Sequence, residues 1–204
     1  VIAGCAHGDS KTQAIARYAC LYAGLPYETS ATFVEMQCGS SIMALNQAAW
    51  KIKMGMSDIA ICGGMECHSQ HPAFMSTITP PYKEMAPICY EKGLTPIAER
   101  DISMISVSDK IAKQWGISRE QCDEFAARSQ ARLQEGYKNG TIGPEILPIT
   151  IPATKKTPEK VINTDEFPRA ETNMEGLSKL RPINADGVTT AGNSSGLNDG
   201  AAAI

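Results

Sequence analysis

The sequence predicts an α/β fold, with a parallel βαβ unit in its first third. Residues 32–36 are rich in β-branched and aromatic side chains, residues 42–54 are apolar on nearly every side of a helix, and residues 58–62 form another largely apolar run. Residues 1–66 hold nine charged residues, whereas residues 67–204 hold the other 32. Strand, buried helix and strand in a poorly charged region predict parallel strands covered on both faces.

The rest of the first third fits the same unit. Residues 1–6 predict a buried strand, and residues 11–23 predict a helix that ends at the Gly-Leu-Pro of residues 24–26. Residues 37–41 predict a tight turn into the buried helix. The last strand of the unit is expected to end at the Gly-Gly of residues 63–64.

The later two thirds of the chain predict helices joined by loops. Residues 106–115 have helical spacing, and Ser118 with Gln121 forms a capping box for a long helix that ends at the Asn-Gly of residues 139–140. Residues 145–151 are strand-like, but the proline within them favours an edge position. Loops are expected where prolines cluster, at Pro72, Pro80, Pro81, Pro87 and Pro96.

Length and composition describe a globular chain. The 204 residues are 43% hydrophobic and 20% charged. With a net charge of −3, the chain lacks the excess positive charge that nucleic-acid-binding proteins use. No apolar run approaches the roughly 18 residues of a membrane-spanning helix. We therefore expect neither a nucleic-acid partner nor a membrane partner.

The two ends of the sequence predict a piece of a longer protein. The chain opens on Val1 without the layout of a signal peptide. It closes on the Gly-Ala-Ala-Ala-Ile of residues 200–204, which is typical of the start of a buried element.

The cysteines predict a reducing compartment, and hence the cytoplasm. Their number is odd and their spacing lacks the paired Cys-x-x-Cys ligands of zinc, so we expect no disulfide framework and no metal site. The seven are Cys5, Cys20, Cys38, Cys62, Cys67, Cys89 and Cys122.

Cys38 is the candidate nucleophile. It lies between a predicted strand and the start of the predicted buried helix. The first turn of a helix offers unpaired N–H groups and a positive dipole end, which favour the thiolate, the nucleophilic form. The following Gly39, Ser40 and Ser41 are small enough to let a substrate approach. The alternative is a structural cysteine buried at a strand end.

Three stretches of the sequence resemble motifs of the thiolases, the family of acetyl-CoA acetyltransferases and 3-ketoacyl-CoA thiolases. Residues 34–44 (Val-Glu-Met-Gln-Cys-Gly-Ser-Ser-Ile-Met-Ala) are similar to the active-site segment of that family. Residues 61–69 resemble its Gly-Gly-Met-Glu-Ser-Met-Ser strand end, and residues 191–203 nearly repeat its Ala-Gly-Asn-Ser-Ser-Gly-Leu-Asn-Asp-Gly motif. Shorter matches occur in the same order, at Arg17, residues 24–26, residues 112–115 and residues 179–182.

The resemblance implies a partial thiolase-like αβαβα layered fold, with most of the N-terminal half and an α+β loop domain. Residues 1–66 are expected to form a partial core with the nucleophile, residues 67–196 a CoA-binding loop domain, and residues 197–204 a return into the core. Since the family forms dimers and tetramers, a homodimer or homotetramer is expected.

The resemblance also implies a reaction. Cys38 would take up an acyl group as a thioester, either for Claisen condensation of two acyl-CoA molecules or for thiolysis of a 3-oxoacyl-CoA, as in fatty acid metabolism. Coenzyme A would be a substrate, and no separate cofactor is expected. The family's Asn-Glu-Ala-Phe, Gly-His-Pro and Cys-Gly-Gly-Gly motifs, which supply the catalytic water, the base and the second cysteine, do not occur in the 204 residues. This chain alone is therefore expected to be inactive.

Five residues match the family's substrate contacts. Arg169 matches an arginine that stacks near the adenine, and Ser195 matches a serine that hydrogen-bonds the pantetheine. Ala191 and Leu94 match apolar pantetheine contacts, and Met104 opens a stretch similar to the family's Met-Gly-x-Thr-Ala-Glu beside the substrate pocket.

Departures from the family leave other interpretations open. Ser41 stands where the family usually has glycine, and Ile105 replaces a glycine beside the pocket. Ser103 replaces a frequent histidine, and Asn184 replaces an aromatic residue. The alternatives are a thiolase-like binding or assembly subunit without catalysis, and a related cysteine-dependent condensing enzyme such as a ketoacyl synthase or a hydroxymethylglutaryl-CoA synthase.

Overall fold

The computed structural model describes residues 1–7, 14–70, 74–76, 88–90 and 93–204. It divides into two compact units, one made of Val1–Lys92 with Leu197–Ile204 and the other of Gly93–Gly196. The sequence prediction placed the first domain boundary at residue 66, whereas the boundary between the two compact units lies after Lys92. The two units are described one by one below.

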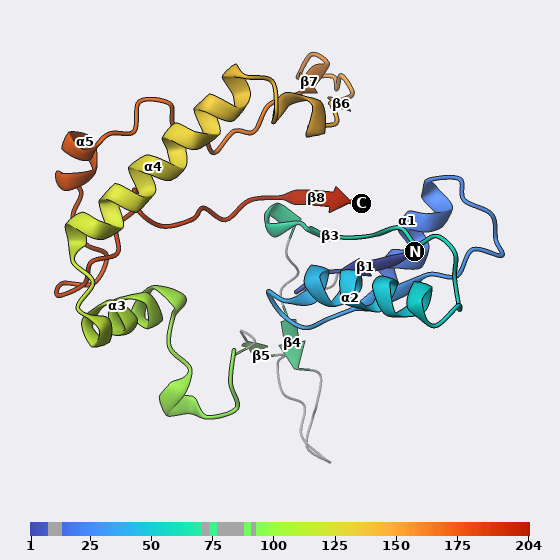
Figure 1. Cartoon of the computed structure of the whole chain (residues 1–204), viewed down its shortest axis with the longest axis horizontal. Coiled ribbons are helices and arrows are strands. Elements are labelled where there is room, and N and C mark those ends of the chain that lie inside the picture. Colours follow the sequence, from blue (N-terminus) through green and yellow to red (C-terminus); the bar gives the residue numbers. More distant parts are fainter. Residues whose placement is uncertain (8–13, 71–73, 77–87, 91–92) are drawn as a thin grey trace. The chain divides into compact units, whose positions relative to one another are not determined.

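A four-stranded mixed sheet forms the first unit. Its strands are β1 (Ile2–Gly4), β2 (Thr32–Val34), β3 (Cys62–Glu66) and β8 (Gly200–Ala203), in the order β2-β1-β3-β8. Strand β1 runs parallel to both β2 and β3, and β8 is antiparallel to β3. Figure 1 shows β1, β3 and β8 side by side. The predicted α/β class and the parallel βαβ unit are therefore confirmed.

Two helices connect the parallel strands. Helix α1 (Ile15–Tyr22) follows β1, and α2 (Ser40–Lys53) lies between β2 and β3 in the chain. The two crossovers run in opposite directions along the sheet, so right-handed connections put α1 and α2 on opposite faces. One face of α2 packs on the sheet in a small core of Ile2, Val34, Ala44, Ala48 and Cys62.

The first turn of α2 lies in direct contact with two glycines of the sheet. A Cβ atom on Gly4 would stand 2.5 Å from the Ser40 carbonyl carbon and 2.7 Å from the Ser41 nitrogen. A Cβ atom on Gly64 would overlap the Ser41 hydroxyl oxygen. Glycine is required at both places because no side chain fits between strand and helix.

The last strand of the βαβ unit starts later than predicted. The sequence placed it over residues 58–62 and ended it at the following glycines, but β3 covers Cys62–Glu66 and contains both glycines. Pairing explains the shift, since Cys62, Gly63 and Gly64 lie opposite Ile2, Ala3 and Gly4 of β1. The short strand pair β4 (Phe74–Ser76) and β5 (Ile88–Tyr90) was also missed.

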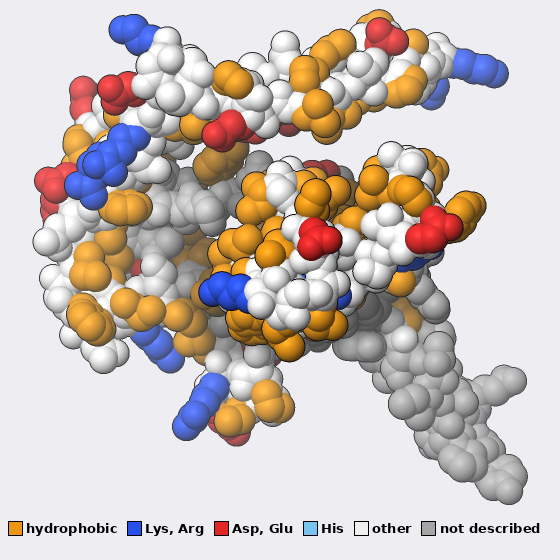
Figure 2. All heavy atoms as spheres, turned by 45° about the vertical axis from the view of Figure 1, so that its right-hand side comes forward, with side chains coloured by type: hydrophobic (Ala, Val, Ile, Leu, Met, Phe, Trp, Pro, Cys, Tyr) orange, Lys and Arg blue, Asp and Glu red, His pale blue; other side chains and the backbone are white. Residues whose placement is uncertain are grey.

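The predicted burial of α2 on all sides is wrong for the part of the chain that the structure describes. Ala44 and Ala48 are buried against the sheet, whereas Ile42 is 63% and Trp50 is 52% exposed. The reason is that the sheet covers only one side of the helix. In the middle of the view of Figure 2, hydrophobic side chains (orange) lie close together on the surface, with few Lys, Arg, Asp or Glu side chains among them. Strand β8, predicted to be buried, is likewise exposed.

The second unit is mainly helical. The expected helix near residues 106–115 is α3, and the capping box at Ser118 and Gln121 opens α4 as predicted, with both reciprocal hydrogen bonds present. The edge strand expected within residues 145–151 is β6, but its partner β7 and the short α5 were not foreseen. The bounds are α3 Met104–Trp115, α4 Arg119–Lys138, β6 Ile149–Ile151, β7 Lys160–Ile162 and α5 Met174–Ser178.

Single-turn 3-10 helices complete the described elements, at His68–Gln70, Ala98–Arg100 and Gly143–Glu145. The predicted helix start at residues 11–13 and the loops around Pro72, Pro80, Pro81 and Pro87 lie outside the described residues.

We expect the substitution Gly4→Ala to lower the free energy of unfolding by about 1–3 kcal/mol, the usual range for overpacking. The added methyl group meets backbone atoms of Ser40 and Ser41, which cannot rotate away. Urea unfolding followed by circular dichroism measures the change. Gly200→Ala is the matched control in the same unit, because an added Cβ meets nothing within 4 Å there. Equal stability of the two variants would contradict the tight packing.

Candidate active site

Cys38 lies in the turn between β2 and α2. The preceding residue, Gln37, has a left-handed backbone with φ of 50°, and Gly39 is the N-cap of α2. Two hydrogen bonds close the turn, from the Gly39 N–H to the Met36 carbonyl oxygen (3.0 Å) and from the Ser40 N–H to the Gln37 carbonyl oxygen (3.1 Å). Cys38 itself is exposed. Cys38 thus stands immediately before the N-terminal end of α2.

Ser40 fixes the turn from inside the protein. This residue is only 3% exposed. Its hydroxyl oxygen accepts a hydrogen bond from the Met36 N–H (2.9 Å), and the hydroxyl donates to the Gln37 carbonyl oxygen (2.6 Å). One side chain thereby holds both residues that precede Cys38, including the strained Gln37. Sequence reasoning treated Ser40 only as a small residue and missed this role.

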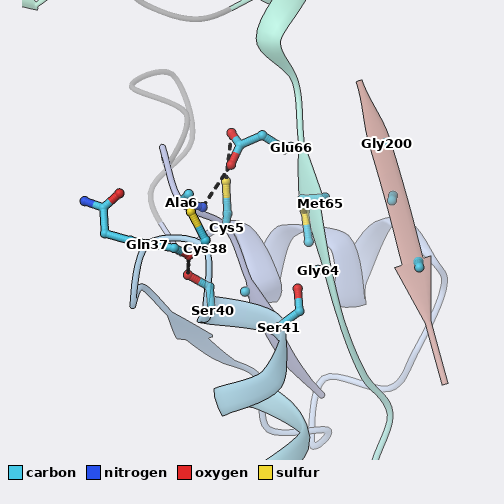
Figure 3. A pocket seen from close by; sticks show the side chains of 13 residues that line it. Cys5, Ala6, Gln37, Cys38, Ser40, Ser41, Gly64, Met65, Glu66 and Gly200 are labelled. Carbon is cyan, nitrogen blue, oxygen red and sulfur yellow. Dashed lines mark hydrogen bonds between the residues drawn. The ribbon is translucent and has the colours of Figure 1, made fainter. Parts of the chain in front are cut away.

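Cys38 lines a pocket of about 370 Å³ in the first unit. The pocket lies at the ends of β1 and β3, over the first turn of α2 and beside β8 (Figure 3). Most of its walls are small residues, namely Gly4, Ala6, Ser40, Ser41, Gly64, Gly200, Ala201 and Ala202. Their size leaves open space beside the Cys38 sulfur.

A carboxylate stands in the same pocket. Glu66 accepts hydrogen bonds from the Ala6 N–H (2.9 Å) and from the Cys5 thiol (3.6 Å), and His7 Nδ1 lies 3.6 Å from its Oε2. Burial raises the pKa of Glu66, but the Ala6 hydrogen bond and the neighbouring His7 outweigh it, so the pKa lies below its ordinary value. The ring of His7 meets that of His68 edge to face, with centroids 5.5 Å apart. Sequence reasoning gave no role to Cys5 or Glu66.

The five predicted substrate contacts all lie in the second unit, whereas Cys38 lies in the first. The Arg169 guanidinium donates to the carbonyl oxygens of Glu166 and Phe167 at 2.8 Å each, and it lies 5.9 Å from the centroid of the Phe167 ring. Leu94 is 57% and Met104 is 63% exposed, and Ala191 and Ser195 are exposed as well. Among the described residues, no hydrogen bond joins these five to one another.

Two hydrogen-bond networks, one around buried Asp123 and one around partly buried Asp109, fix the segment that carries Ala191 and Ser195. Asp123, 1% exposed, pairs with Arg119 (2.8 Å) and accepts a hydrogen bond from the Asn193 amide (2.9 Å). Asp109 accepts hydrogen bonds from Thr189 through its N–H (3.0 Å) and its hydroxyl (2.7 Å). Burial raises the pKa of Asp109, but these hydrogen bonds outweigh it and leave the pKa below its ordinary value.

The positions that depart from the family pattern are accommodated locally. Ser41 lies in the first turn of α2 against Gly64 and lines the pocket. Ser103 is the N-cap of α3 and accepts a hydrogen bond from the Ser106 N–H (3.2 Å). The Asn184 amide donates to Asp109 (2.7 Å). Ile105 lies in the first turn of α3 and is partly buried.

The described residues hold neither a metal-binding cluster nor a membrane-spanning helix. No group of three or more histidine, cysteine, aspartate or glutamate side chains is arranged to hold a metal ion there. None of the helices described is both long enough and apolar enough to cross a membrane.

The fold and the pocket define a class: α/β proteins with an exposed cysteine at a helix N-terminus over the ends of parallel strands. The family model described as the thiolase N-terminal domain matches residues 1–204. The chain therefore belongs to the thiolase family. This result confirms the family and the partial thiolase-like layered fold that the motifs implied.

Similar proteins carry thiolase and acetyltransferase names. The chain is 40% identical over 213 residues to the beta-ketoadipyl-CoA thiolase of Acinetobacter baylyi, covering 100% of this chain and 53% of that protein. It is 40% identical over 198 residues to the acetyl-CoA acetyltransferase of Allochromatium vinosum, covering 93% and 49%. The crystal structure of the Bacillus anthracis acetyl-CoA acetyltransferase matches with a TM-score of 0.86 at 32% identity, covering 99% and 51%. The chain thus spans about half the length of the curated relatives it matches.

We expect Ser40→Ala to slow alkylation of Cys38 by iodoacetamide several-fold. The substitution removes both hydrogen bonds that hold Met36 and Gln37, so the turn no longer fixes the thiol at the helix N-terminus. Peptide mass spectrometry measures the rate at Cys38, with exposed Cys67 as the internal reference. Ser40→Thr, which keeps the hydroxyl, should restore part of the rate. A rate for Ser40→Ala equal to that of the wild type would contradict the role of Ser40.

Proposed function

We propose that this chain carries the nucleophile and part of the CoA site of an acyl-CoA C-acyltransferase, with Cys38 as the acyl carrier. The observation that carries the proposal is the position of Cys38: it is exposed, follows a strained residue, stands at the N-terminus of α2 and lines a pocket walled by small residues. Membership of the thiolase family over residues 1–204 supports it.

In the proposed reaction the Cys38 thiolate attacks the carbonyl carbon of an acyl-CoA. A thioester to Cys38 forms and CoA leaves as its thiol. In the synthetic direction, the α-carbanion of a second acyl-CoA attacks that thioester and gives a 3-oxoacyl-CoA. In the degradative direction, the Cys38 thiolate attacks the 3-oxo carbon of a 3-oxoacyl-CoA, the bond between C2 and C3 breaks, and acetyl-CoA leaves as its α-carbanion and takes up a proton. The acyl group then passes from Cys38 to the thiol of free CoA. Negative charge develops on a carbonyl oxygen in each step, and backbone N–H groups are suited to stabilise it.

The second unit is proposed to hold CoA through Arg169, Ser195, Ala191, Leu94 and Met104. All but Arg169 offer neutral contacts, which suits the pantetheine, while Arg169 offers the positive charge that the adenosine phosphate end needs. CoA acts in this proposal as a substrate, with no further cofactor. The exposed apolar side chains of α2 favour the proposal that the protein forms homodimers or homotetramers.

Acetyl-CoA should protect Cys38 from alkylation. In the absence of substrate, we expect iodoacetamide to modify Cys38 before Cys67, because both are exposed but only Cys38 lies at a helix N-terminus beside the pocket. Acetyl-CoA should slow labelling of Cys38 several-fold and leave Cys67 unchanged, as followed by peptide mass spectrometry. Desulfo-CoA is the control for simple occupancy of the CoA site.

Equal labelling of the two cysteines, with no effect of acetyl-CoA, would instead favour a thiolase-like binding or assembly subunit. That outcome would remove Cys38 as the acyl carrier.

The 204-residue chain alone should give no thiolysis of acetoacetyl-CoA. The proposed mechanism needs a base for the Cys38 proton and a second group for the α-proton, and the motifs that supply them in the family do not occur in these residues. Loss of the 3-oxoacyl-CoA absorbance measures turnover. A fusion of residues 1–204 to the remaining half of the Acinetobacter baylyi relative should turn over, and its Cys38→Ala variant should not. Full activity of the short chain would contradict the requirement.

A further inference from the structure

Two cysteines share the pocket that we assign to the acyl group. Of the cysteines whose side chains the structure describes, Cys5 and Cys38 line it, whereas Cys20, Cys62, Cys67 and Cys122 do not. In the view of Figure 3 the sulfur atoms of Cys5 and Cys38 lie on the same side of the pocket, toward the Glu66 carboxylate. The proposed reaction uses Cys38 and gives Cys5 no task.

The chain segments that carry the two thiols are in contact. The Cys5 N–H donates to the Val34 carbonyl oxygen (3.3 Å), which ties the end of β1 to the strand leading to Cys38. Gly4 precedes Cys5, and the side of Gly4 where a Cβ atom would stand lies against the backbone of Ser40, two residues after Cys38. A disulfide needs a short Cα separation, which requires that the two segments lie in contact, as these two do.

The two thiols differ in access and in hydrogen bonding. Cys38 is exposed, so an oxidant in solution reaches its sulfur first. Cys5 is only 6% exposed, and its thiol donates to Glu66 Oε1 (3.6 Å), so its sulfur is shielded yet held in the pocket. An accessible thiol at a helix N-terminus beside a shielded second thiol is the arrangement of an oxidisable cysteine with a resolving partner.

We propose that Cys5 is the resolving thiol of a peroxide-driven Cys5–Cys38 disulfide, which reversibly removes the nucleophile of the proposed acyl-transfer site. The Cys38 thiolate attacks one oxygen of a hydroperoxide, so the O–O bond breaks, Cys38 becomes a sulfenic acid and the second oxygen leaves as hydroxide or alkoxide. The Cys5 sulfur then attacks the sulfenic sulfur. The S–S bond forms, and the Cys5 proton leaves with the sulfenic hydroxyl as water. A dithiol reduces the bond and restores both thiols.

The regulatory meaning of this disulfide rests on the proposed function, but the disulfide itself is tested without acyl-CoA. The 204-residue chain is treated with hydrogen peroxide, blocked with iodoacetamide and digested without reductant. Before the block we expect the intact mass to fall by two hydrogens. After digestion we expect a peptide pair joining Cys5 to Cys38, and dithiothreitol should restore both thiols. Cys67→Ser, which removes an exposed thiol outside the pocket, should form the same disulfide.

In Cys5→Ser, Cys38 should stop at the sulfenic acid, which dimedone traps, and should go on to the sulfinic acid with excess peroxide. Wild-type chain that gives only oxygen adducts on Cys38, or a disulfide from Cys38 to another cysteine, would overturn the proposal. This measurement on the wild type does not depend on how well a variant folds. Failure here leaves the acyl-carrier role of Cys38 intact, whereas failure of acetyl-CoA protection would contradict that role and not the pairing.

Discussion

The close contact between the first turn of α2 and the ends of β1 and β3 is the constraint on which the site depends. Gly4 faces the backbone of Ser40 and Gly64 faces the side chain of Ser41, so neither strand has room for a Cβ atom at that point. The helix therefore begins directly over the strand ends, and the turn before it holds Cys38 there. The same small residues leave the pocket beside the thiol open.

The second unit is fixed by hydrogen-bonded carboxylates, of which Asp123 is buried. An ionised aspartate that is 1% exposed is costly unless it is paired and hydrogen-bonded, and Asp123 meets both conditions through Arg119 and Asn193. These partners tie α4 to a segment that has no regular structure of its own. Thr190, although polar, is fully buried there, and its hydroxyl oxygen accepts from the Gly192 and Asn193 N–H groups.

Structural features set by neighbouring residues could be predicted from the sequence, whereas features set by residues far apart in the chain could not. The Ser118 capping box lies within four residues, and the turn at Cys38 follows directly from the change between strand and helix patterns. The predicted start of β3 was wrong because the actual start depends on pairing with Ile2, sixty residues earlier in the chain. The predicted burial of α2 on all sides was wrong. An apolar pattern shows which helix surfaces favour burial, but it does not show which elements pack against them.

Residues that support Cys38 were missed for the same reason. Ser40 is one of several small residues in its stretch, and only the two hydrogen bonds across the turn distinguish it. Cys5 is separated from Glu66 by 61 positions, so their hydrogen bond leaves no signature in either local pattern. Both residues acquire their surroundings from the packing of α2 on Gly4 and Gly64. Because that packing brings the end of β1 against the Cys38 turn, the contact that positions the Cys38 thiol also places a second thiol in its pocket.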